Sequence, residues 1–581
     1  MNHRSLIDSV AARLAAWHAG RLTRQFFRAV DRAGATQKRL LAELVSAGAE
    51  SDFGRQHGFG RVRSYADFAA QVPIQTYADL APYIDRVRRG EVQALFRPGE
   101  RILMFALTSG TTAEPKYIPI TRRALADWRR GWSVWGLKAL LDHRECILRH
   151  IVQVTSPMED HRSPSGVPCG AITGLLAATQ RKLVLRYYTS PLAIAAIKDS
   201  AAKYYTIMRL AIPRDVSWMV TANPSTLLLL ARAANEHHQL LIRDICDGTL
   251  AAEMPVDGDI RAALRPLLRP DPACAARLKA IIHQHGTLYP RHYWRLGYLA
   301  HWMGGTMGLY VPQLARYFGE VPSRDIGLIA SEGRMSVPLA DGTPAGVLAV
   351  TSQFFEFIPT VEYGTPKPTV LRSQEVREGE EYFLLLTNAS GLYRYDIGDR
   401  VRVTGRLGEA PLIEFLSRDA HTSSLTGEKL TEDQVVTAMQ HGCGGGEELV
   451  NFVLAPRWAE TPYYRLYLEG TAEPFRLRAK GDQPGTVGEL VWALSGPRLE
   501  ERLDAALCAV SVEYASKRET LRLAPVELAL LPPGFLADRD RDLRSQRSRT
   551  GEQFKHQYLL PRPDLDRDLD EAAIRMPTRR R

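Results

Sequence analysis

The hydroxyl-rich loop near residue 110 is the first segment of the chain whose side chains could do chemistry. It contains Ser109, Gly110, Thr111 and Thr112, and Lys116 follows it closely. Glycine lets backbone N–H groups approach a phosphate, and the hydroxyls can donate further hydrogen bonds. The same composition is typical of an ordinary turn, so the loop alone leaves both a phosphate site and a turn open.

A hydroxyl stands beside a carboxylate at Ser331 and Glu332, in a turn-rich segment. These are the groups needed to hold a reacting carboxylate together with a magnesium ion, which prefers oxygen ligands. Further on, Asp399 follows Gly398 and could accept hydrogen bonds from both hydroxyls of a ribose. Asp399 could equally cap a turn, and the residues alone leave both interpretations open.

Three basic residues in the last third of the chain could stabilise phosphate charge. Arg418 lies in a segment of mixed charge, Lys429 follows Glu428, and Lys555 follows a glycine turn. Cationic side chains stabilise charge that develops on phosphate oxygens. Each could also be a surface ion pair or a solvated helix residue.

Several common motifs of nucleotide-binding and hydrolytic enzymes do not occur. The sequence has no Walker loop, no H-E-x-x-H, no G-x-S-x-G and no G-x-G-x-x-G. Its six cysteines lie far apart and form no C-x-x-C pair. This spacing favours reduced thiols and a cytoplasmic protein, although an even number leaves disulfides open.

Taken in order, these segments resemble the GH3 acyl-acid amido synthetases, a branch of the acyl-adenylate-forming superfamily that includes firefly luciferase and the acyl-CoA synthetases. The resemblance spans nearly the whole chain, and the order of the motifs is more specific than any one of them. The matching stretches are Thr108–Thr112 with Lys116–Pro119, Ser331–Gly333, Phe355–Pro359, Gly391–Asp399 with Val401–Gly405, and Glu428–Glu432.

The resemblance implies a ligase with two half-reactions. A carboxylic acid and ATP, with magnesium, form an acyl-adenylate and pyrophosphate; an amine, often an amino acid, then attacks the acyl carbon and releases AMP. The resemblance assigns ATP binding to Ser109, Gly110, Thr111, Thr112, Ser331, Asp399, Arg418 and Lys429. It assigns catalysis to Glu332, which would hold magnesium, to Lys429 at the α-phosphate, and to Lys555.

The chain departs from the family pattern at several positions. The loop before Lys116 is one residue shorter than the plant form, Leu328 stands where a tyrosine is expected near the adenine, and Asp396 replaces an arginine of plant members. The C-terminal motif can be aligned on Gln553–Lys555, which we prefer, or on Gln557–Arg562, which has no lysine. Two alternatives stay open: acyl transfer to a thiol such as coenzyme A or a carrier protein, and a non-catalytic protein that binds nucleotide or acyl acid.

Composition narrows the class of protein and its partners. With 581 residues, 45% of them hydrophobic and 24% charged, the chain is typical of a folded soluble protein of two to four units. Its net charge is +10, and its basic residues cluster near the end, with acids mixed into the largest cluster, so we expect no nucleic-acid partner. No run of 18 apolar residues exists, so we expect no membrane partner. The oligomeric state and the particular acid and amine cannot be read.

Helices and strands alternate along most of the chain, which predicts an α/β protein. We expect helices up to about residue 100, and strands at 117–120, 347–350, 354–358 and 382–386. Together with the resemblance, this predicts a large N-terminal adenylate-forming domain over residues 1–418, in which β-sheets pack against helices around ATP and the acyl acid. A small, mobile α+β cap domain is predicted over residues 419–581.

Overall fold

The computed structural model describes residues 20–108, 115–418, 422–442, 452–469, 499–536, 538–540 and 557–573. The chain forms two compact units, whose main boundary lies between Arg418 and Asp419. Each unit has its own buried core, and each is described by itself.

Helices dominate the beginning of the N-terminal unit, as the sequence predicts. They are α2 (Ala33–Gly48), α3 (Asp52–Gln56), α4 (Tyr65–Gln71) and α5 (Tyr77–Arg88). Helix α4 begins with a capping box in which Ser64 accepts from the Asp67 N–H and the Asp67 carboxylate accepts from the Ser64 N–H. Such reciprocal bonds satisfy backbone donors that the first helical turn leaves without partners.

The loop near residue 110 connects two antiparallel strands, β1 (Ile102–Thr108) and β2 (Lys116–Thr121). They belong to a four-stranded sheet in the order β2-β1-β5-β4, with β4 at His161–Arg162 and β5 at Pro168–Gly170. The predicted strand at 117–120 is confirmed. Helix α6 (Arg122–Asp142) follows β2 at once, and the Thr121 side chain caps it by accepting from the Ala124 N–H.

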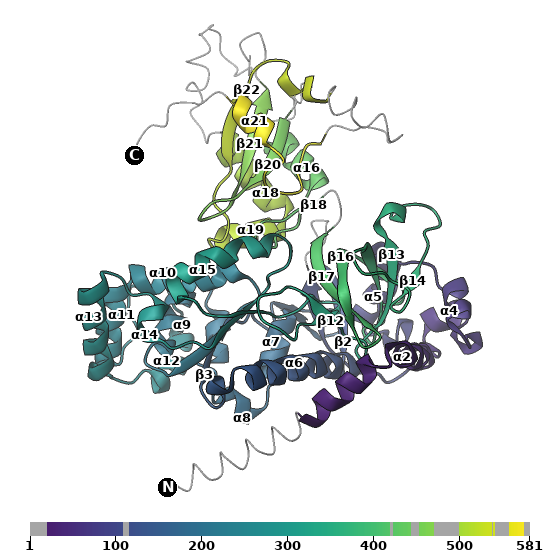
Figure 1. The fold of residues 1–581 in the computed structure, drawn as a ribbon, viewed down its shortest axis with the longest axis horizontal. Coiled ribbons are helices and arrows are strands. Elements are labelled where there is room, and N and C mark those ends of the chain that lie inside the picture. Colours follow the sequence, from purple (N-terminus) through teal and green to yellow (C-terminus); the bar gives the residue numbers. More distant parts are fainter. Residues whose placement is uncertain are drawn as a thin grey trace. The chain divides into compact units, whose positions relative to one another are not determined.

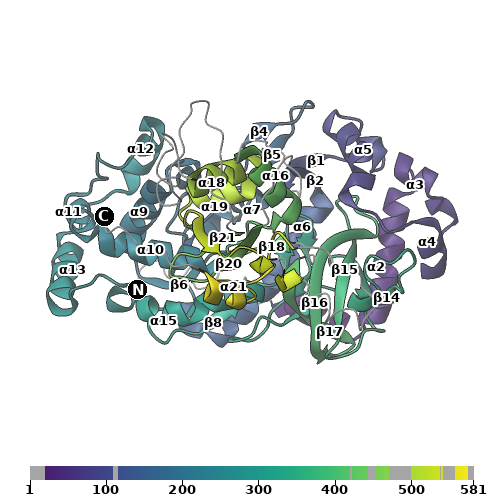
Figure 2. The same ribbon diagram turned by 90° about the horizontal axis from the view of Figure 1, so that it is seen from above.

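A second, fully parallel sheet has the strand order β3-β6-β7-β8. Its strands are His150–Gln153, Val216–Val220, Tyr298–His301 and Ser323–Asp325. Helices gather at this end of the N-terminal unit, as Figures 1 and 2 show. They are α8 (Lys182–Leu185), α9 (Ser200–Ala211), α10 (Pro224–Glu236), α11 (His238–Asp247), α12 (Gly258–Leu264), α13 (Pro272–His285), α14 (Pro290–Tyr293) and α15 (Val311–Phe318). Helix α7 (Ile172–Ala178) lies nearer the middle of the unit and contacts β1.

A seven-stranded antiparallel sheet forms the other end of this unit, beside α2, α4 and α5 (Figure 1). Its order is β11-β12-β17-β16-β15-β13-β14. The strands are β11 (Ser336–Val337), β12 (Gly346–Leu348), β13 (Phe354–Pro359), β14 (Leu371–Arg372), β15 (Glu381–Thr387), β16 (Tyr395–Leu407) and β17 (Ala410–Arg418). The predicted strands at 354–358 and 382–386 are confirmed, whereas the strand predicted at 347–350 ends at Leu348, before the turn near Thr351.

The C-terminal unit is a small α+β fold around a sheet in the order β20-β21-β22. Its strands are β18 (Thr422–Ser423), β19 (Leu430–Thr431), β20 (Phe452–Arg457), β21 (Tyr463–Glu469) and β22 (Glu527–Leu531), and its helices are α16 (Glu432–Gly442), α18 (Leu499–Val510), α19 (Val512–Glu519) and α21 (Arg567–Ala572). Alternate residues of β20 enter separate cores: Phe452 and Leu454 pack with α16 and α18, whereas Val453 and Ala455 pack with Leu569 of α21. This alternation is the two-residue period of a strand covered on both faces.

The architecture confirms the predicted α/β class. Among the described residues, no helix is both long enough and apolar enough to cross a bilayer. The described cysteines, Cys146, Cys169, Cys246, Cys274 and Cys508, are free thiols, in agreement with the reduced state that their spacing favours.

Candidate active site

Ser331 and Glu332 lie in the turn between two short paired strands, β9 (Ile329–Ala330) and β10 (Gly333–Arg334). The Ser331 hydroxyl donates a 2.9 Å hydrogen bond to the carbonyl of Leu107, one residue before the end of β1. This bond fixes the turn beside the start of the hydroxyl-rich loop. Two segments that are 224 residues apart in the sequence, and that sequence analysis names separately, are thus brought together.

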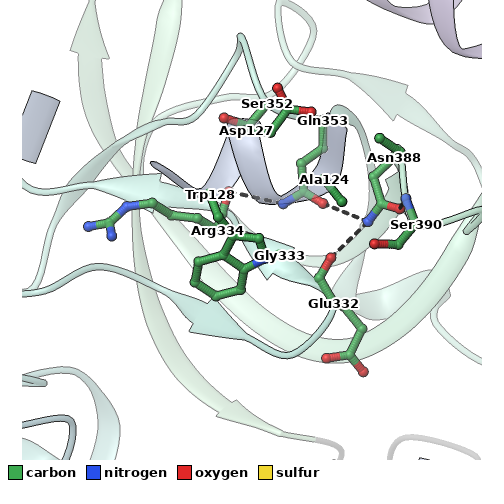
Figure 3. Close-up of a pocket in the computed structure, with 11 residues that line it drawn as sticks. Ala124, Asp127, Trp128, Glu332, Gly333, Arg334, Ser352, Gln353, Asn388 and Ser390 are labelled. Atoms are coloured by element: carbon green, nitrogen blue, oxygen red, sulfur yellow. Dashed lines mark hydrogen bonds between the residues drawn. The ribbon is translucent and has the colours of Figure 1, made fainter. Parts of the chain in front are cut away.

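Amide side chains behind the turn fix the backbone on both sides of Gly333, as Figure 3 shows. Asn388 donates to the Glu332 carbonyl at 2.9 Å, and Gln353 donates to the Arg334 carbonyl at 2.9 Å. A Cβ atom on Gly333 would lie only 2.7 Å from the Gln353 amide. Glycine is therefore required for this close approach.

The Glu332 side chain is 2% exposed, and its Oε2 atom has no hydrogen-bond partner among the described residues. The other oxygen, Oε1, accepts only a long 3.5 Å hydrogen bond from the Tyr395 hydroxyl. A buried carboxylate oxygen without a donor is costly unless a ligand supplies positive charge. Magnesium commonly takes one or two carboxylates together with substrate phosphates, so this residue fits such an ion. No cluster of three or more metal-ligating side chains occurs in the described chain.

Asp399 lies directly opposite Arg418 in the antiparallel pair β16 and β17. The sequence analysis assigns both residues to the nucleotide, and this register brings their backbones together. Asp399 is 5% exposed, in a strand whose burial alternates from one residue to the next. For Arg418, the structure describes the backbone position.

A small pocket behind Gly333 is lined by Asp127 and Trp128 of α6 and by polar side chains of the segments around residues 352 and 388 (Figure 3). Its volume of about 20 Å³ accommodates about one water molecule. Asp127 lines this pocket, and its Oδ2 atom has no partner among the described residues. Burial raises the pKa of Asp127 to about 6.

A buried ion pair joins Glu356 and Arg394, and no sequence motif indicates it, although both residues lie in segments that resemble the family. The Arg394 Nε is 3.0 Å and 3.2 Å from the two Glu356 oxygens. Arg394 also donates to the Val72 carbonyl at 2.8 Å, and the Tyr65 hydroxyl donates to Glu356 at 2.9 Å. The pair thus ties α4 to the seven-stranded sheet that carries Asp399.

In the C-terminal unit, Lys429 follows a buried carboxylate that shapes its loop. Glu428 is 1% exposed and accepts from the backbone N–H groups of Leu425, at 2.6 Å, and Thr426, at 2.7 Å. Lys429 itself has a φ of +50°, a left-handed conformation that costs energy for a residue with a Cβ atom. Strained backbone of this kind is common where a side chain has a functional task.

Several predicted site residues lie outside the described residues: Ser109, Gly110, Thr111, Thr112 and Lys555. The residues that depart from the family pattern have clear structural surroundings. Leu328 is half-buried, and its N–H donates to the Ser336 hydroxyl at 2.9 Å. Asp396 caps a turn by accepting from the Gly398 N–H and also accepts from the Tyr363 hydroxyl, each at 2.9 Å. The Lys116 ammonium lies 5.5 Å from the centre of the Tyr77 ring.

Two ligases of solved structure share this fold. A solved structure titled GH3.15 acyl acid amido synthetase matches 95% of this chain and 96% of its own, with a TM-score of 0.63 and 20% identity. A 2-hydroxyisobutyryl-CoA ligase in complex with 2-HIB-AMP and CoA matches 94% of this chain and 92% of its own, with a TM-score of 0.50 and 15% identity. At these identities the likeness concerns the fold alone.

The sequence identifies the family. The GH3 family N-terminal domain matches residues 22–323, the GH3 family central domain residues 346–418, and the GH3 family C-terminal domain residues 433–564. The chain belongs to the GH3 family, and the predicted resemblance is confirmed.

Two relatives show how far the similarity extends. Jasmonoyl-L-amino acid synthetase JAR4 of Nicotiana attenuata is 24% identical over 526 residues, which cover 86% of this chain and 87% of the relative. Indole-3-acetic acid-amido synthetase GH3.8 of Oryza sativa subsp. indica is 27% identical over 568 residues, which cover 93% of this chain and 90% of the relative.

Proposed function

We propose that this protein is an ATP-dependent ligase that activates a carboxylic acid as an acyl-adenylate and transfers the acyl group to an amine, an amino acid, to form an amide. The observation that carries the proposal is the match of all three GH3 domains along one chain. The buried, unpartnered oxygen of Glu332 beside Ser331 supports it with a site that fits magnesium and a phosphate group.

In the first half-reaction, a substrate carboxylate oxygen attacks the α-phosphorus, and the bond to the bridging oxygen of pyrophosphate breaks. We assign Asp399 to the ribose hydroxyls, with Arg418 opposite it near ribose or phosphate. Glu332 holds magnesium, and Ser331 with the 109–112 loop holds phosphates. When bound, magnesium neutralises phosphate charge and makes the α-phosphorus more electrophilic.

In the second half-reaction, the amine nitrogen attacks the acyl carbon, AMP leaves with the electrons of the acyl–oxygen bond, and one proton is released. We assign Lys429 to the α-phosphate oxygens, where it acts during adenylation, and Lys555 to a second catalytic contact. Fixed cations at these oxygens stabilise the charge that builds there in the transition state.

We assign ATP and acyl-acid binding to residues 1–418 and the function of a mobile cap to residues 419–581. A cap that closes over the reacting groups would keep water from the mixed anhydride. We place the reaction in the cytoplasm, because the free thiols of the described cysteines are typical of a reducing compartment.

A second candidate is transfer of the acyl group to a thiol, because a coenzyme A ligase shares the fold. The two functions give different products, since an amide survives neutral hydroxylamine and a thioester does not.

The test is pyrophosphate release from ATP and magnesium with a panel of aromatic, indolic and aliphatic acids, in the presence of hydroxylamine as a trap. We expect acid-dependent release together with hydroxamate formation. The matched variant Glu332→Gln keeps the side-chain shape but removes the charge, so we expect pyrophosphate release to fall and the magnesium requirement to rise. ATP binding with no pyrophosphate release for any acid would contradict the proposed function.

A further inference from the structure

Arg334 is a fully buried cation whose hydrogen-bonding capacity is largely unused. Its side chain is 1% exposed, and one guanidinium nitrogen, Nη2, donates to the carbonyl of Ile326. The Nε and Nη1 atoms have no acceptor among the described residues.

The nearby carboxylate of Asp325 does not satisfy this cation. Asp325 accepts instead from the backbone N–H groups of Met303 and Gly327, each at 2.6 Å. Within the described chain, Arg334 forms no salt bridge. Arg324, which is also buried, has the charged partners expected of a structural arginine. It forms ion pairs of 2.7 Å and 2.6 Å with Asp142 and Asp341.

Helix α6 leaves a space in which this side chain fits closely. A Cβ atom on Gly131 would lie 2.4 Å from the Arg334 Cδ, so a glycine is required where the arginine crosses the helix. The guanidinium carbon lies 4.5 Å from the centre of the Trp132 ring. The Trp132 Nε1 atom is also buried without an acceptor among the described residues. The guanidinium and the indole N–H are thus two neighbouring buried donors that lack acceptors among the described residues, and an anionic group could satisfy them.

These donors lie next to the candidate active site. Arg334 follows Glu332 by two residues, and both line the pocket behind Gly333 (Figure 3). Their side chains point in different directions from this turn, so the group at the guanidinium is not the one at the Glu332 carboxylate (Figure 3). Trp132 is only half-buried, as are residues 328–331.

We propose that Arg334 and Trp132 bind a second acidic group of the acid substrate, so that the preferred substrate is an acid with two carboxylates. This inference rests on the proposed function. The guanidinium holds the distal carboxylate through its Nε and Nη1 donors, and the reacting carboxylate remains free for the α-phosphate on the Glu332 side. A carboxylate bound by a guanidinium would be a poor nucleophile, which is a further reason to assign the distal group to Arg334.

The experiment compares matched pairs of acids, glutaric acid with its monoamide and isophthalic acid with its monoamide, in pyrophosphate release by the wild type and Arg334→Met. Methionine replaces the buried cation with an apolar side chain of similar length, which such sites tolerate well. We expect the wild type to prefer the diacid by about tenfold or more in kcat/KM, and Arg334→Met to reduce this ratio to about one, chiefly by lowering kcat/KM for the diacid.

A stability measurement separates a ligand-binding arginine from a structural one. We expect Arg334→Met to unfold at the same temperature as the wild type or higher, and Arg324→Met to unfold at a lower one, because it leaves Asp142 and Asp341 without their partner. Equal rates for diacids and monoamides in the wild type would overturn the inference and leave the proposed function intact.

If no acid supports pyrophosphate release, the proposed function fails, and calorimetric titration of the two diacids decides the inference. Binding to the wild type that is lost in Arg334→Met would support it. Equal binding to both proteins, or no binding to either, would overturn it.

Discussion

The hydroxyl of Tyr464 donates a 2.5 Å hydrogen bond to the carboxylate of Glu428, the residue before Lys429. Both partners are buried. The carboxylate also accepts from the loop backbone at Leu425 and Thr426. A strand of the C-terminal unit thus fixes, through one hydroxyl, the loop in which Lys429 adopts its left-handed backbone conformation.

Tyr464→Phe is expected to slow adenylation through Lys429. Loss of one hydrogen bond to a buried carboxylate destabilises the C-terminal unit by about 1–3 kcal/mol and loosens the lysine. Because small displacements of a catalytic group reduce the rate, kcat of pyrophosphate release should fall while KM for ATP changes little. In the background of Lys429→Ala, the same substitution should have no further effect on the rate.

Tyr514→Phe is the matched control for this prediction. Tyr514 is equally buried in the same core, and its hydroxyl donates to Asp504 at 2.6 Å rather than to Glu428 of the Lys429 loop. It should lose comparable stability and keep its kcat. A rate loss of the same size in both variants would show that Tyr464 acts through general stability.

Arg394→Met is expected to destabilise the N-terminal unit by about 3–5 kcal/mol, because it leaves the Glu356 carboxylate buried without a cation. Burial already raises the pKa of Glu356, against the opposing effect of Arg394. Urea denaturation followed by tryptophan fluorescence measures the change. The exposed pair Arg372 and Glu375 provides the control, since Arg372→Met should cost about 1 kcal/mol or less. Similar losses in the two variants would contradict the assignment.

The sequence predicts the local elements of this fold better than its long-range contacts. Strands β13 and β15 are evident because each is a run of apolar residues that is buried along nearly its whole length. The site motifs are also evident, because glycines and hydroxyls cluster in them. The Glu356–Arg394 pair is not evident from the sequence, because the two residues are 38 positions apart and meet only through the register of the sheet. Nothing local indicates that Gly131 makes room for Arg334 either.

Asp127→Asn is expected to stabilise the protein at neutral pH. The pKa of Asp127 is about 6 in the folded chain and 3.8 when unperturbed, so between these values the folded state binds more protons. Stability from this group is therefore lost as the pH rises from about 4 to 6. At pH 7.5 the variant should gain about 1–3 kcal/mol in unfolding free energy, and the gain should vanish near pH 4.

Asp142→Asn on the same helix should show the opposite sign. Burial favours the neutral form of Asp142, but hydrogen bonds from Lys138 and Arg324 outweigh it and lower the pKa. The variant should lose stability at pH 7.5, and the loss should shrink as the pH falls through the lowered pKa. If both variants respond to pH in the same direction, the assignment of Asp127 as a costly buried carboxylate is wrong.

Asp399→Asn is expected to weaken ATP use without unfolding the protein. A carboxylate accepts hydrogen bonds from two ribose hydroxyls, whereas an amide offers a single neutral oxygen, so KM for ATP should rise about tenfold or more. The wild type should discriminate against 2′-deoxy-ATP and 3′-deoxy-ATP, and the variant should lose most of this discrimination.

Asp396→Asn, three positions earlier on the same strand, is the control, because the Asp396 carboxylate already accepts hydrogen bonds from Tyr363 and Gly398. It should keep the wild-type preference for the ribose hydroxyls. Wild-type discrimination in Asp399→Asn would mean that the ribose is bound elsewhere and that the role of Asp399 is structural, in the pairing of β16 with β17.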